Sequence, residues 1–188
     1  MPNAPRPVPP VLPILPVLVA SGRSADRARS IACLLLDAAQ RSGWAERLDV
    51  RVGGFDAGAG LAGEASRRAL AAVGITAAGT HGVADLAEHA ALFDGVACIV
   101  CDTADTADDL LDWDEAGEAQ FVVLDEVEGR EASPDDEDAP APSLAEQVAA
   151  DASCIEEVLR RVVTSPPPSG RLRDDDLDLE DDEEGDED

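Results

Sequence analysis

The sequence contains no lysine and no tyrosine, and only two histidines among its 188 residues. Aromatic residues make up 3% of the chain, which leaves few rings to stack on a flavin. It also lacks an uninterrupted apolar run of the length that crosses a membrane, because four prolines break the apolar stretch from Val8 to Ala20. That stretch carries no signal-peptide cleavage site, so we expect a cytoplasmic protein without a membrane-spanning segment.

The charge of the chain is strongly negative. Its 41 acidic residues oppose 14 basic ones, all arginine, which gives a formal net charge of −27. Such a field repels nucleic-acid phosphates and anionic lipid, so we expect neither as a partner. Twelve of the fifteen residues from Asp174 to Asp188 are acidic, which predicts a solvated, disordered tail. A docking tail for a basic partner, or adaptation to high salt, would leave the same composition.

The four cysteines do not form a recognisable metal site. Cys98 and Cys101 make a C-x-x-C pair, but they lie within the apolar run Val96–Cys101, which reads as a buried strand. A structural zinc site needs about four ligands, and neither a second C-x-x-C nor a suitably spaced histidine pair follows. We therefore predict buried, reduced cysteines and no metal or cofactor.

Hydrophobic patterning predicts that strands and helices alternate along the chain, which indicates an α/β fold: a three-layer sandwich with a four-stranded parallel sheet. A Pro-rich disordered arm (1–13) precedes this α/β domain (14–164), a loose acidic loop (about 128–142) interrupts it, and an acidic tail (165–188) follows it. Ser143 and Glu146 fit a capping box at the start of the last helix. The predicted strands are Ile14–Ala20, Leu48–Phe55, Gly95–Cys101 and Gln120–Leu124, and the predicted helices are Ala25–Ser42, Ala62–Val73, Val83–Leu92, Ala107–Leu111 and Leu144–Val163.

The segment Val17–Arg29 combines a strand, a short glycine-containing loop and the start of a helix. Loop amides and the positive end of a helix dipole then point at one spot, which suits an anion. The segment lacks lysine, the Walker spacing and G-x-G-x-x-G, so it is not a nucleotide loop of either kind.

This segment resembles the opening of the low-molecular-weight protein tyrosine phosphatases, in which the first strand leads into C-x-G-N-x-x-R-S. Pairing the glycine of that motif with Gly22 puts Ala20 at the nucleophile position and Asp26 at the position of the phosphate-binding arginine. Moving the pairing by one residue puts Ser21 and Arg27 at the ends of C-x5-R, but misplaces the glycine. Serine is a far weaker nucleophile than a thiolate unless a base activates it.

The likeness extends from about Ile14 to Thr164. The place of the family's general acid, an aspartate followed by proline, is taken here by Asp125, which precedes a glutamate. Three further segments are similar in order and spacing to S-A-G-T, A-L-x-x-x-G-I and F-D-x-V of the family: Phe55–Ala59, Ala69–Ile75 and Phe93–Val100.

The resemblance implies a phosphatase, and the altered positions Ala20 and Asp26 predict that catalysis is lost. We expect a catalytically inactive pseudophosphatase that acts as a binding or regulatory module. Its candidate ligand-binding residues, for a protein partner or a phosphorylated ligand, are Ser21, Gly22, Arg23, Ser24 and Arg27. The alternatives are an active phosphoester (phosphotyrosine) hydrolase with a non-standard loop, and another small parallel α/β domain such as a flavodoxin-like or sugar-transport phosphocarrier domain.

Overall fold

The computed structural model of the chain describes residues 13–22, 24–55, 63–76, 82–129 and 142–164. The expected arm and tail, Arg23, the segment 56–62 and most of the expected acidic loop lie outside these residues. The expected domain boundaries therefore remain a prediction.

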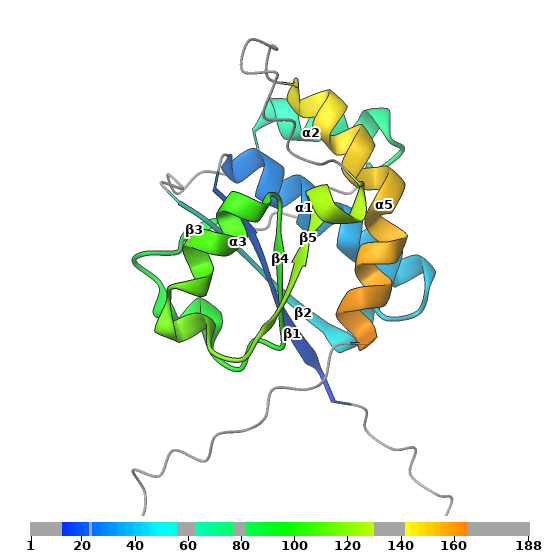
Figure 1. Ribbon diagram of the computed structural model, residues 1–188. Coiled ribbons are helices and arrows are strands. Elements are labelled where there is room, and N and C mark those ends of the chain that lie inside the picture. Colours follow the sequence, from blue (N-terminus) through cyan, green and yellow to red (C-terminus); the bar gives the residue numbers. More distant parts are fainter. Residues whose placement is uncertain (1–12, 23, 56–62, 77–81, 130–141, 165–188) are drawn as a thin grey trace, which may run out of the picture.

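A single parallel sheet of five strands forms the centre of the structure, in the order β3-β2-β1-β4-β5 (Figure 1). The four predicted strands are confirmed with ends shifted by up to three residues. The prediction of only four strands is wrong, because a two-residue strand, β3, adds an edge beside β2. The strands are β1 (Leu15–Ser21), β2 (Leu48–Gly54), β3 (Ala84–Asp85), β4 (Cys98–Cys101) and β5 (Gln120–Val123).

The helices begin and end close to the signals in the sequence. Ser24 caps the first helix by accepting a hydrogen bond from the Arg27 amide, and the predicted capping box joins Ser143 to Glu146. No helix among the described residues combines the length and hydropathy that crossing a membrane requires. The helices are α1 (Ala25–Arg41), α2 (Glu64–Ala72), α3 (Ala104–Leu111), α4 (Leu124–Val127) and α5 (Leu144–Thr164), and the short 3-10 turns are η1 (Ala45–Arg47), η2 (Ala90–Phe93) and η3 (Asp114–Ala116).

Both faces of the sheet are covered, as the expected three-layer sandwich requires. Side chains along a strand alternate between faces, so Val17 and Val19 pack on one side of β1, while Leu18 and Ala20 pack on the other. The first face is covered by α1, α2 and α5, and the second by α3 with η2 and η3. Full burial on both faces explains why β1 reads as a continuous apolar run.

The helix predicted at Val83–Leu92 is wrong: this segment forms β3, a turn and η2. Its backbone pairs with β2, where the Leu86 amide donates to the Gly54 carbonyl at 3.2 Å. The Leu86 side chain is fully buried against Gly53, and a Cβ atom there would overlap it. Sheet pairing and burial of this leucine therefore outweigh the local helical pattern.

The strand order places a reversal between β1 and β4, since the chain moves from β1 to β2 on one side and returns to β4 on the other. In open parallel sheets, ligands bind outside the carboxyl ends of the strands at such a reversal. Here β1 ends at Ser21 and β4 ends at Cys101, with Ala20 opposite Cys101 in the register. The loops that follow these two strands define the candidate site.

Candidate functional site

The hydroxyl of Ser21 lies at the centre of the site. Ser21 is fully buried at the end of β1, and its Oγ donates to Oδ2 of Asp102 at 2.6 Å. The same oxygen accepts a hydrogen bond from the Ser24 amide at 3.2 Å, so the loop folds back over this side chain. Ser21 thus has a carboxylate within hydrogen-bond distance that offers it a base, but its side chain is fully buried.

Asp102 connects the loop after β1 to the start of α3. It is fully buried, and its second oxygen accepts a hydrogen bond from Oγ1 of Thr106 at 2.7 Å. The Thr106 hydroxyl oxygen in turn accepts from the Gly22 amide at 3.0 Å. A loop amide that would face an anion in a phosphate cradle is therefore paired with a threonine of the same chain.

Arg27, on the first turn of α1, reaches three carboxylates from three other parts of the chain. Its Nη2 lies 3.0 Å from Oδ1 of Asp151 on α5 and 3.5 Å from Oδ1 of Asp125 on α4. Its Nη1 lies 3.7 Å from Oδ2 of Asp102. The guanidinium is 3% exposed, and both Asp102 and Asp151 are completely buried.

Burial lowers the pKa of Arg27, but the hydrogen bond and charge of Asp151, together with the charges of Asp102 and Asp125, outweigh it and raise that pKa above its ordinary value. Arg27 is therefore a permanent cation whose donors are directed at carboxylates. The cluster of one arginine and three aspartates carries an excess of negative formal charge, which opposes the entry of a phosphate.

Ala20 and Asp26 lie away from this cluster. The Ala20 side chain is fully buried on the α3 side of the sheet, within the apolar core. The Asp26 carboxylate faces α2, where its Oδ1 accepts hydrogen bonds from the Gly63 amide at 3.1 Å and from Nη1 of Arg29 at 3.0 Å. Ala20 and Asp26, the two altered motif positions, therefore lie apart from each other and from the carboxylates around Arg27.

Ser21 and Arg27, the residues of the shifted pairing, both approach Asp102, whereas Ala20 and Asp26 of the pairing through Gly22 lie apart. Ser21, Gly22, Ser24, Arg27 and Asp125 all lie in or against the cluster, and Arg23 lies outside the described residues. Asp125 occupies the first turn after β5, with its side chain 28% exposed, and it contacts the arginine. The role of Asp125 as a general acid remains a prediction.

Three site residues were missed by the sequence analysis: Asp102, Thr106 and Asp151. Asp151 carried a detectable signal, since it stands on the apolar stripe of α5 between Val148 and Cys154, where an unpaired carboxylate would be costly. Asp102 directly follows the most apolar strand, which placed it at the carboxyl edge of the sheet. Thr106 carried no signal in the sequence.

The four cysteines are buried and form no disulfide. Cys98 and Cys101 lie in β4 as predicted, and the Cys154 thiol donates to the backbone carbonyl of Asp151 at 3.3 Å. Burial raises the pKa of the Cys101 thiol, and burial with the nearby charges of Glu128 and Asp151 raises the pKa of Cys154 to about 12. Within the described ranges, His, Cys, Asp and Glu side chains form no group of three or more arranged to hold a metal.

Solved structures of low-molecular-weight protein tyrosine phosphatases share this fold. The YwlE arginine phosphatase, a Cys-to-Ser mutant with a phosphorylated active-site serine, matches with a TM-score of 0.60 and 17% identity over 80% of this chain and 97% of that one. A low molecular weight protein tyrosine phosphatase from Bacillus subtilis matches with a TM-score of 0.54 and 18% identity over 79% and 95%. A protein tyrosine phosphatase from Entamoeba histolytica matches with a TM-score of 0.59 and 12% identity over 79% and 93%.

At these identities the comparisons establish the fold alone, which is that of the low-molecular-weight protein tyrosine phosphatases. No curated protein matches the chain. The family model for the flexible hinge domain of SMC proteins matches residues 82–165, which is less than half of the chain and omits β1, its loop and α1.

Proposed function

We propose that this chain is a catalytically inactive relative of the low-molecular-weight phosphatases that acts as a binding or regulatory module. One observation carries the proposal: the arginine that approaches the loop after β1 is already bound by Asp102, Asp125 and Asp151. A phosphoryl group would have to displace these carboxylates and then remain beside them. That arrangement disfavours an anionic ligand more strongly than the absence of a cysteine alone.

The state of the loop supports the same proposal. The Gly22 amide is directed at Thr106 and the Ser24 amide at Ser21, so two donors that would hold phosphoryl oxygens have partners within the chain. Hydrolysis also needs a nucleophile that substrate can reach, and Ser21 is fully buried. For these reasons we propose a protein rather than a phosphorylated ligand as the partner, and a cytoplasmic location remains a prediction.

One observation favours a second candidate, a phosphoester hydrolase that uses Ser21. The 2.6 Å hydrogen bond to Asp102 is the contact through which a general base would activate the hydroxyl. In the YwlE mutant, a serine of the active site is phosphorylated, so a serine in this fold is able to carry phosphate. This alternative requires the cluster to open far enough for substrate to reach Ser21.

Hydrolysis of a small aryl phosphate by the full chain distinguishes the two candidates. We expect no turnover above the blank, and the same result for Ser21→Ala. The matched control is Ser153→Ala, which removes an exposed hydroxyl on α5 far from the loop in sequence. Turnover by the wild type that Ser21→Ala abolishes and Ser153→Ala preserves would establish the hydrolase and overturn the proposal.

A cysteine introduced at the loop tests separately whether the carboxylates around Arg27 keep phosphate out. Ser21→Cys places a cysteine beside Arg27, whereas Ala20→Cys places it in the core on the α3 side. We expect both variants to remain inactive, because the carboxylates still surround Arg27. Activity of Ser21→Cys alone would show that phosphate enters despite them, and would contradict the reasoning from charge.

A further inference from the structure

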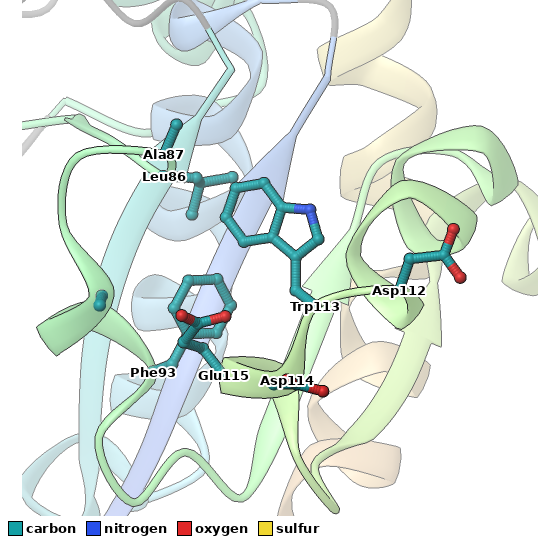
Figure 2. A pocket seen from close by; sticks show the side chains of 8 residues that line it. Leu86, Ala87, Phe93, Asp112, Trp113, Asp114 and Glu115 are labelled. Carbon is teal, nitrogen blue, oxygen red and sulfur yellow. The ribbon is translucent and has the colours of Figure 1, made fainter.

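A hollow lies on the α3 side of the sheet, between the segment that contains η2 and the segment that contains η3 (Figure 2). Its volume is about 440 Å³, within the range of small-ligand sites. None of the described lining residues belongs to the site around Ser21 and Arg27. The lining consists of Leu86, Ala87, Ala90, Phe93, Asp112, Trp113, Asp114 and Glu115.

Two aromatic residues, Phe93 and Trp113, line the hollow, and neighbouring rings pack against Trp113. Trp113 packs edge-on against Phe55, with ring centroids 5.5 Å apart and planes at 81°. It also packs against Phe93, with centroids 5.9 Å apart. Trp113 is only partly buried, so part of its indole remains open to the hollow, and Figure 2 shows it between Leu86 and Phe93.

Within the described part of the chain, every charged side chain that lines the hollow is negative. Asp112, Asp114 and Glu115 contribute carboxylates, and no arginine is among these lining residues. The carboxyl end of α3, which carries partial negative charge, lies at Asp112. The indole face attracts cations as well, so the ring, the helix end and the carboxylates favour the same ligand charge.

We infer that this hollow is a binding site for the guanidinium group of an arginine side chain, presented by a basic segment of a partner protein. A planar guanidinium stacks on an indole face while it pairs with a carboxylate, which a compact ammonium does less well. The chain already contains this contact elsewhere, since the guanidinium carbon of Arg47 lies 4.2 Å from the ring centre of Trp44. The inference goes beyond the proposed function and does not depend on whether the loop after β1 is inactive.

The carboxylates are not equivalent in this site. In Figure 2 the carboxylates of Asp112 and Asp114 both point away from the aromatic side chains, which leaves Glu115 as the acidic lining residue that is not directed away from them. We therefore assign the ion pair with the guanidinium to Glu115. Asp112 contributes only through its longer-range charge, so its variant serves as a comparison with Glu115.

The test is a titration of the full chain followed by the indole N–H signals of its two tryptophans in ¹H–¹⁵N correlation spectra. The probes are N-acetyl-arginine amide, the corresponding lysine amide, and the citrulline amide, which has nearly the shape of arginine without its charge. We expect the arginine compound to shift the Trp113 signal saturably, with a dissociation constant of roughly millimolar order. The Trp44 signal serves as an internal reference, because Arg47 already covers that ring.

Variants make the assignment specific. We expect Glu115→Gln to weaken arginine binding roughly two- to fivefold, as the loss of one exposed ion pair does, and Asp112→Asn to weaken it less, because only its long-range field is lost. Equal shifts with citrulline, equal shifts of both tryptophans, or no shift of Trp113 would overturn the inference. Stronger binding of the lysine compound would also overturn it, because the site would then select charge without the planar group.

Discussion

Arg27 on α1 and Asp151 on α5 form an ion pair at 3.0 Å between Nη2 and Oδ1, although the two residues are 124 positions apart in the sequence. Both side chains are almost completely removed from solvent. The pair joins the helix that follows the loop of β1 to the last helix of the domain. It therefore joins two helices of the fold directly beside the loop that follows β1.

Removal of Asp151 should destabilise the fold strongly, because it leaves a buried arginine without its shortest ion pair. We expect Asp151→Ala to lower the free energy of unfolding by about 3 kcal/mol, measured by urea denaturation. The control is Glu157→Ala on the same helix, whose ion pairs with Arg160 and Arg161 are exposed and should contribute little. Similar losses for both variants would show that Arg27 does not depend on Asp151.

Addition of a methyl group at Gly22 should strain the contact between the loop and α3. A Cβ at Gly22 would lie 2.8 Å from Oγ1 of Thr106, whereas one at Gly82 would meet nothing within 4 Å. We expect Gly22→Ala to cost roughly 1–3 kcal/mol and Gly82→Ala to cost much less, again by urea denaturation. If the two variants were equally stable, the hydrogen bond between the Gly22 amide and Thr106 would not fix this loop.

The exposed pairs on α5 predict a dependence of stability on pH. Hydrogen bonds from Arg160 and Arg161, together with their charges, lower the pKa of Glu157 from 4.5 to about 2. Because the pKa is lower in the folded state, the stabilisation is present above about pH 4.5 and is lost as the pH falls toward 2. The thermal midpoints of wild type and Glu157→Gln should differ slightly at pH 6 and converge near pH 2, and a constant difference would contradict this.

Much of the fold followed from the sequence because its signals are local. β1 and β4 are buried on both faces and therefore read as apolar runs, and Ser24 and the Ser143–Glu146 pair mark helix starts by side-chain chemistry. β3 could not be predicted in this way. Its two residues are a strand only because β2 offers backbone partners and Gly53 leaves room for Leu86.

The candidate site was only partly predictable because its defining contacts are long-range. The sequence motif placed an arginine and a serine near the end of β1, and left two pairings open. The choice between them depends on where Asp26 points and which carboxylates approach Arg27, and those partners come from α2, α4, α5 and the end of β4. Of the three residues that the sequence analysis missed, Asp151 on the buried stripe of α5 and Asp102 at the end of the most apolar strand carried a signal in the sequence.

The most direct test of the central account is a titration of the ¹⁵N-labelled full chain with inorganic phosphate, followed at the amide signals of Gly22 and Ser24. These amides are paired with Thr106 and Ser21, and Arg27 beside them is held by three carboxylates. The account predicts that neither signal moves as phosphate is added at constant ionic strength. A saturable shift of both signals would show that the loop binds phosphate, and would contradict it.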